Sequence, residues 1–267
     1  MNQAEHALRE LREMDALASR TSFVHALCPL SKLFATIAYI AVVVSFGKYD
    51  LAGLAPLALW PVLLFQWSGV SLRACFRKLR FVLPLVLAVG LFNPIFDRAP
   101  HLMLGTLAVS GGVVSMATLA LKGVLCLMAS FLLAATTRVD ALCAALRRLR
   151  VPGVLVTLLL LTCRYVGVMT EEVAVMSDAY ALRAPGQKGV AFRAWGSFLG
   201  QLLLRSMDRA GELYDAMLLR GFREEFRYAD AAPCTARDVA YLAASLGTFA
   251  LLRFVRVAPL LGGLIVK

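Results

Sequence analysis

Long runs of apolar residues alternate with short polar or basic segments along the chain. Residues 33–46 and 51–70 are uncharged, and residues 47–50 form a polar break between them. Three further apolar runs cover residues 81–96, 113–136 and 239–266. About 20 apolar residues cross ~30 Å of hydrocarbon as a helix. The pattern therefore predicts an all-α, polytopic membrane protein with about five transmembrane helices, the first two forming a hairpin.

The segment after the fourth run has a different pattern. Residues 154–163 are apolar and continue without a helix breaker into a charged stretch. Apolar residues then recur at three- and four-residue steps in two sets: Met169, Val173, Met176 and Tyr180, and Leu199, Leu202, Leu203, Met207, Ala210, Leu213, Tyr214 and Met217. Such stripes indicate amphipathic helices. We expect helix 154–183 to start in the inner leaflet without crossing, and both helices to lie against the cytoplasmic face.

Basic residues set the expected orientation. Segments 71–80 and 137–150 each hold four basic residues, whereas segments 47–50 and 97–112 each hold one. Because cytoplasmic loops of membrane proteins are enriched in Lys and Arg, the first two segments are predicted to be cytoplasmic loops. The N-terminus is then cytoplasmic, the polar block 171–237 stays inside, and the C-terminus lies outside.

The same patterns divide the chain into four segments. An N-terminal amphipathic segment covers 1–31, and the first four transmembrane helices lie within 32–136. A cytoplasmic connection and the two amphipathic helices occupy 137–237, and the last transmembrane helix lies within 238–267.

Composition narrows the class of protein. Hydrophobic residues make up 60% of the 267 residues, and charged residues make up 17%, against about a quarter in soluble domains. The mean hydropathy is +0.74. These values exclude an ordinary soluble enzyme and a disordered chain. The net charge of +11 fits cytoplasmic loops beside a lipid membrane, and no basic patch with interleaved aromatic residues indicates nucleic-acid binding.

Few residues have the spacing of a catalytic or metal site. The six cysteines include no C-x-x-C pair, and His6, His25 and His101 are far apart in sequence. No P-loop motif is present. Lys122 lies within the predicted span 113–136, where a lysine marks function by default. Snorkelling, or a position facing a partner's polar cavity, explains Lys122 equally well.

Both amphipathic helices end in a similar way. The first ends Leu182-Arg183-Ala184-Pro185-Gly186 and the second Leu219-Arg220-Gly221. Arginine in a last helical turn and a left-handed glycine after it are favourable at any helix end. Capping explains each end separately, but it does not explain the near-repeat 37 residues apart. The repeat hints at two equivalent sockets on a twofold-related partner.

An ordered set of motifs accompanies these ends. It comprises His25 to Pro29 followed by Lys32, Arg148-Leu149-Arg150-Val151-Pro152, Arg164-Tyr165, Glu171-Glu172, and the run from Arg209 to Phe222. This set resembles the transmembrane (T) components of energy-coupling factor transporters, in particular the cobalt/nickel type called CbiQ or NikQ. The resemblance covers roughly residues 22–226.

Arg183 and Arg220 match the arginines of the family's two Ala-Arg-Gly-like motifs. This chain departs from that pattern in having Leu182 and Leu219 before the arginines, and Ala184 where the first motif has glycine. The departure leaves the cap at Arg183 less well defined than the cap at Arg220.

The resemblance implies a non-catalytic subunit of an ATP-driven importer in the bacterial cytoplasmic (inner) membrane. Two ATP-binding cassette ATPase subunits would bind ATP, and a membrane S component would capture cobalt, rather than nickel. This chain, which would hold no cofactor or metal, links them. Its ATPase-coupling residues would be Leu182, Arg183, Ala184, Leu219, Arg220 and Gly221, with support from Arg164, Glu171, Glu172, Arg209, Glu212 and Met217.

Three alternatives remain. The first is a T component for a vitamin such as biotin, which the sequence distinguishes poorly from the metal type. A secondary transporter that binds its own substrate predicts facing intramembrane charges and an inverted repeat, and neither is visible. An intramembrane enzyme needs paired carboxylates or a Ser–His set within the spans, which contain none.

Overall fold

The computed structural model describes residue 13 and residues 16–93, 100–104, 107–187, 189–222 and 234–254. Residues 1–12, 14 and 15 of the predicted N-terminal segment, and the predicted last span beyond Phe254, lie outside these residues. The chain divides into two compact units, which are described separately. One comprises residues 17–137 and 232–267, and the other comprises residues 1–16 and 138–231.

The first unit begins with the predicted helical hairpin. Helix α2 spans Pro29–Ser45 and starts with proline at its first position, where no intrahelical N–H bond is lost. The second apolar run is broken into α3 (Leu51–Leu54), the 3₁₀ helix η1 (Ala55–Ala58) and α4 (Leu59–Ser68). Pro56 lies in η1 and lacks the N–H that a continuous α-helix would use.

Helix α5 (Leu72–Gly90) corrects the prediction for residues 71–80. The basic segment is not a loop, because it forms the first half of α5. Cys75 and Leu79 are buried one turn apart, while Arg73, Arg77, Lys78 and Arg80 are exposed. No glycine or proline interrupts the helix before Pro84, which lies inside it. A basic stretch with one buried stripe therefore continues as helix.

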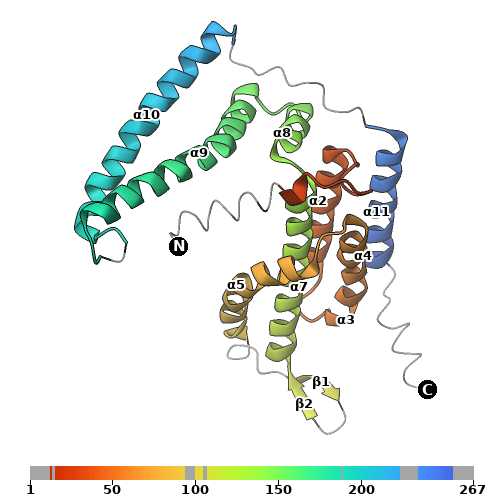
Figure 1. The fold of residues 1–267 in the computed structure, drawn as a ribbon. Helices are drawn as coiled ribbons and strands as arrows, with labels where there is room; N and C mark the ends of the chain where they lie inside the picture. Colours follow the sequence, from red (N-terminus) through yellow and green to blue (C-terminus); the bar gives the residue numbers. More distant parts are fainter. Residues whose placement is uncertain are drawn as a thin grey trace. The chain divides into compact units, whose positions relative to one another are not determined.

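Helix α7 (Gly111–Thr136) packs against α2, α3, α4 and α5, and α11 (Ala236–Phe254) packs against α2 (Figure 1). Strands β1 (Pro100–Leu104) and β2 (Leu107–Ser110) pair antiparallel just before α7. In the part of the chain that the structure describes, the regular structure is therefore helical apart from one short hairpin, where the sequence predicted an all-α fold with a loop. A pairing of a few residues satisfies its backbone locally and leaves little periodic signal.

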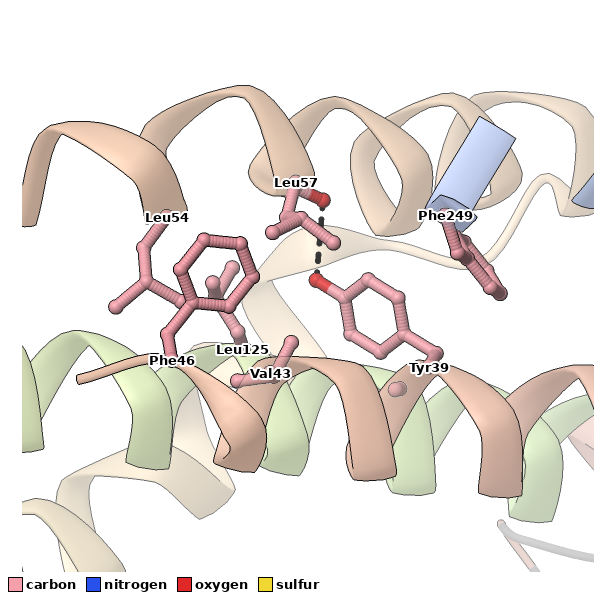
Figure 2. Close-up of a cluster of buried hydrophobic side chains, with 8 residues drawn as sticks. Tyr39, Val43, Phe46, Leu54, Leu57, Leu125 and Phe249 are labelled. Atoms are coloured by element: carbon pink, nitrogen blue, oxygen red, sulfur yellow. Dashed lines mark hydrogen bonds between the residues drawn. The ribbon is translucent and has the colours of Figure 1, made fainter. Parts of the chain in front are cut away.

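The core of this unit forms where α2, η1, α7 and α11 meet. Figure 2 shows Tyr39 pointing towards Leu57, and its hydroxyl donates a hydrogen bond to the Leu57 carbonyl oxygen at 3.0 Å. The Tyr39 ring stacks on Trp60 at 4.6 Å between centroids and lies 5.3 Å from the Phe249 ring. Leu125 of α7 closes the cluster. Burial of these rings removes a large apolar area from solvent and so stabilises the unit.

Lys122 and Arg253 hold the C-terminal end of α2. The Lys122 ammonium donates to the carbonyl oxygens of Val44 and Phe46 at 3.2 and 2.6 Å. The Arg253 guanidinium donates to the Ser45 carbonyl at 3.4 Å and lies 4.8 Å from the centroid of the Phe46 ring. Cations at a helix C-terminus satisfy its free carbonyls and complement its dipole. The structure thus gives Lys122 a structural partner within its own chain.

Asp238 joins the starts of α2 and α11. Its carboxylate oxygens accept from the backbone N–H groups of Cys28 and Thr235, both at 2.8 Å. Burial alone raises the pKa of Asp238, but these two N–H donors, the Thr235 side chain and nearby Arg237 outweigh burial and lower the pKa below its usual value. Nearby, buried Lys32 donates to the Thr136 carbonyl at the end of α7, at 2.8 Å.

The second unit consists of α8 (Val139–Arg148), α9 (Gly153–Arg183), η2 (Phe192–Ala194) and α10 (Trp195–Leu219). Helix α9 agrees with the predicted helix 154–183. Among the described helices, α7 and α9 are long and apolar enough to cross a membrane by length and composition, and α2 is a shorter apolar helix. The number of crossings, and whether α9 is one of them, stay predictions.

Candidate functional site

The connection between α9 and α10 is built around Tyr180. Its hydroxyl donates to the Gln187 side-chain oxygen at 3.0 Å and accepts from the Ala191 N–H at 3.4 Å. Gly186 and Gly189 turn the chain with φ values of +92° and +79°, which L-residues with a Cβ rarely adopt. Tyr180 was predicted as a member of an apolar stripe, and its hydroxyl also orders this connection.

The end of α10 has the predicted left-handed glycine. Gly221 has a φ of +79°. Its N–H donates to the Leu218 carbonyl at 2.9 Å, and the Phe222 N–H donates to the Met217 carbonyl at 3.0 Å. These two bonds form a Schellman motif, which fixes Arg220 at the helix C-cap. The cap prediction for this end is confirmed.

The end of α9 has a different geometry. Arg183 is the last helical residue, and the C-cap Ala184 has φ −127° and ψ 67°, with its N–H bonded to the Tyr180 carbonyl at 3.0 Å. The left-handed residue is Gly186, three positions after Arg183. A Cβ disfavours the left-handed conformation, so the turn is deferred past Ala184 to the next glycine. The two ends therefore share a sequence pattern but not a backbone conformation.

Each of these two ends presents an apolar and a cationic side chain to solvent. Leu182 is 85% exposed and Leu219 is 90% exposed. Arg183 and Arg220, which follow them, are also exposed. We call Leu182-Arg183 and Leu219-Arg220 the two tips. An exposed leucine beside an exposed arginine, present twice, is chemically complementary to a surface with an apolar and an anionic part.

A polar cleft of about 460 Å³ lies between α9 and α10. Its lining residues are Met169, Glu172, Arg205, Asp208, Arg209 and Glu212. Glu172 of α9 forms an ion pair with Arg205 of α10, and this pair bridges the two helices. Glu172, Arg209 and Glu212, predicted as supporting residues, are thus brought together.

Three other predicted supporting residues are placed elsewhere. Arg164 and Glu171 are exposed and do not line this cleft. Met217 lines an apolar groove of about 440 Å³ with Phe222 and the α9 residues Val154, Thr157, Leu158 and Leu161. Met217 and Phe222 are also the residues bonded in the Schellman motif, where an apolar contact commonly accompanies the turn.

Arg205 was missing from the predicted supporting residues. The sequence shows it on the charged side of α10, but four other charged residues share that side. The partner lies 33 residues away on another helix, so helical periodicity gave no signal for the pair.

The described residues do not assemble a metal centre. No group of three or more His, Cys, Asp or Glu side chains lies close enough to hold an ion among them. His25 instead pairs with the Ser22 hydroxyl at 2.7 Å and the Leu17 carbonyl at 3.0 Å. What the α9–α10 arrangement presents is a set of exposed apolar and charged side chains.

Comparison with known proteins agrees with the motif pattern. A family model described as CbiQ, cobalt transport protein, matches residues 20–228. The chain is 34% identical over 102 residues to the cobalt transport protein CbiQ of Rhodobacter capsulatus, covering 38% of this chain and 42% of that protein. It is 31% identical over 91 residues to the nickel permease LarQ of Lactiplantibacillus plantarum, covering 34% and 33% of the two chains.

A third relative is an uncharacterized protein of Methanocaldococcus jannaschii, 26% identical over 143 residues, covering 53% of this chain and 49% of that protein. The chain spans less than half the length of each of these three relatives. The family model, in contrast, extends over most of the chain and includes both tips. The chain therefore belongs to the CbiQ cobalt transport family.

Proposed function

We propose that this chain is the transmembrane coupling component of an ATP-driven, energy-coupling factor importer for cobalt ions. It would link two ATP-binding cassette ATPase subunits to a separate S component that binds the ion. It would itself bind neither ATP nor metal and catalyse no reaction. The observation that carries the proposal is the pair of tips, each presenting an exposed leucine and arginine at the end of a long helix.

In this mechanism each tip docks into a groove on one of the two ATPase subunits. Arg183 and Arg220 would make charge-assisted hydrogen bonds with acidic or carbonyl groups in those grooves. ATP-driven closure of the ATPase pair would then move α9 and α10. Their exposed apolar residues, including Leu199, Leu203 and Met207, would pack on the S component and transmit the movement to its ion site.

We propose the bacterial cytoplasmic membrane as the location, with five crossings and a cytoplasmic N-terminus. The distribution of basic residues supports this topology. Docking also requires that the ends of α9 and α10 lie on the cytoplasmic side, where the ATPase subunits would be. Single-cysteine variants at Arg193 and Gln201, made in a background lacking the six native cysteines, would test it. Labelling of both by a membrane-impermeant reagent in intact cells would reject the arrangement.

The docking step is tested by reversing the charge of both tips. In the whole complex, Arg183→Glu with Arg220→Glu is expected to abolish co-purification of the ATPases and cobalt uptake. Arg73→Glu with Arg193→Glu, also an exposed pair, carries the same change of charge and should retain both. Uptake that survives in the double tip variant contradicts the proposal.

Nickel is the alternative ion, because one relative is a nickel permease. Uptake of radioactive cobalt, measured with and without excess nickel, separates the two. The other T-component substrates, vitamins such as biotin, are tested in the same uptake assay, and vitamin uptake without metal uptake would reject a metal importer.

A further inference from the structure

Helix α8 is a short amphipathic helix with arginines at its end. Cys143 and Ala145 are buried, whereas Arg148 and the following Arg150 are exposed and Arg147 is partly exposed. The carboxylate of α8, Asp140, lies at the opposite end of the helix and pairs with Arg138 at 3.5 Å. Three arginines therefore lie in the last turn of α8 or just beyond it.

Arg150 has an unusual backbone conformation. Its φ is +62°, and among the described residues no other non-glycine residue has a left-handed φ. The Arg150 N–H donates to the Arg147 carbonyl at 3.0 Å, and the Val151 N–H donates to the Leu146 carbonyl at 3.3 Å. Arg150 thus occupies the left-handed position of a Schellman motif, which usually holds glycine.

Helix α10 provides an internal comparison. It ends in the same motif, with Gly221 at the left-handed position. Gly69, Gly186 and Gly189 occupy the other left-handed positions among the described residues. A helix dipole favours cations within the last turn, which accounts for Arg147 and Arg148. It does not account for a strained arginine beyond the helix end, where glycine fits without strain. Such retained strain is typical of a residue with a role outside packing.

The surface next to Arg150 changes abruptly from cationic to apolar. Helix α9 starts three residues later, and Val154, Leu155 and Leu158 in its first two turns are 61%, 55% and 61% exposed. This helix is long and apolar enough to cross a membrane. Arginines at the edge of an exposed apolar helical surface match the boundary between phosphate headgroups and acyl chains.

We propose that Arg147, Arg148 and Arg150 bind the phosphate group of an anionic phospholipid, with the acyl chains lying along Val154, Leu155 and Leu158. Guanidinium groups bind phosphate through paired, charge-assisted hydrogen bonds. Arg150 lies beyond the helix end, and its left-handed backbone conformation directs the side chain from there. Arg150 can therefore reach a phosphate that Arg147 and Arg148 approach from the last turn.

Native mass spectrometry of the full chain in detergent tests this site with added phosphatidylglycerol and phosphatidylcholine. The wild type should retain phosphatidylglycerol preferentially. Each arginine at a membrane surface contributes roughly a fivefold change in affinity for anionic lipid. Arg150→Gly should therefore lower phosphatidylglycerol retention about fivefold, and the triple variant Arg147→Gln, Arg148→Gln, Arg150→Gly should remove the preference for it.

Arg150→Gly also separates binding from folding, because glycine relieves the strain and the thermal midpoint should stay the same or rise. A higher midpoint with unchanged lipid retention would show a purely structural role and overturn the proposal. The matched control is Arg73→Gln, Arg77→Gln, Arg80→Gln on α5, which removes the same charge from exposed positions. If this control loses as much phosphatidylglycerol as the triple variant, the proposal of a specific lipid site is overturned. Displacement of the lipid by millimolar inorganic phosphate would also overturn it.

Discussion

The two compact units of the chain contrast in how their helices are stabilised. In the unit of residues 17–137 and 232–267, Tyr39, Leu57, Leu125 and Phe249 from different helices are almost completely buried. In the other unit, α9 buries only Val156 and Thr157, and α10 buries no residue along its length. One unit forms its own core, whereas the two long helices of the other leave their apolar residues accessible.

This difference indicates what covers the apolar side chains of each unit. An amphipathic helix gains most of its stability by packing its apolar face, and a large exposed apolar surface marks a site for a partner or a membrane. The polar bridge between Glu172 and Arg205 and the ordered caps hold α9 and α10 in shape. Under the proposed function, the S component, the ATPases and lipid supply the missing contacts.

The strongest test of the contrast removes one large side chain from each unit. Phe249→Ala in the core is expected to lower the free energy of unfolding by about 3–5 kcal/mol, because it leaves a cavity among buried rings. Leu203→Ala on α10, where the side chain is more than half exposed, should change it by less than about 0.5 kcal/mol. Thermal unfolding in detergent measures both, and similar effects would remove the distinction between the units.

Asp238→Asn tests the polar tie within the packed unit. Loss of the charge shared by two helix starts should cost about 1–2 kcal/mol. Because the pKa of Asp238 is lowered in the folded state, its stabilising contribution is complete above the unfolded pKa of about 3.9. The contribution is lost as the pH falls through the lower folded pKa.

A pH series of unfolding midpoints from pH 7 to pH 3 measures this effect. Below about pH 4 the wild type should lose more stability than Asp238→Asn, and the two midpoints should converge. Parallel curves for the two proteins would show that the carboxylate has no differential protonation on folding. Asp215→Asn, at an exposed position on α10, is the matched control for the removal of one carboxylate.

Gly221→Ala and Ala184→Gly test the difference between the two tips. At Gly221 a new Cβ would meet no atom within 4 Å, so its effect isolates the left-handed φ, which costs about 1 kcal/mol. The variant should also weaken ATPase co-purification, because Arg220 loses its fixed position. Ala184→Gly should leave stability within about 0.5 kcal/mol. Equal effects of the two variants on stability would mean that the two ends have equivalent caps.

The ion pair between α9 and α10 has the smallest expected effect on stability. The Arg205 side chain is 46% exposed, and such pairs contribute ~0.2–1 kcal/mol. Glu172→Arg and Arg205→Glu should each reduce ion uptake by the whole complex, because two like charges push the helices apart. The double charge swap should restore uptake. A double variant as impaired as either single one would show that the pair does not position the helices.

The helical segments were largely predictable from sequence, while their interruptions were not. The apolar runs gave α2, α7 and α9 with nearly correct bounds, because helical periodicity and breakers act over a few residues. The continuation of α5 through the basic segment was missed, since positive charge was interpreted as a loop. The short hairpin before α7 was also missed.

Some features of the candidate site were likewise predictable from sequence, and others were not. Sequence alone predicted the helix ends at Arg183 and Leu219, the glycine cap at Gly221 and the family, because chirality at a helix end and an ordered set of motifs depend on local residues. Tertiary structure alone decided that Lys122 caps α2 and that Glu172 meets Arg205. These features join residues on different helices, and the free energy of such contacts is set by packing in three dimensions.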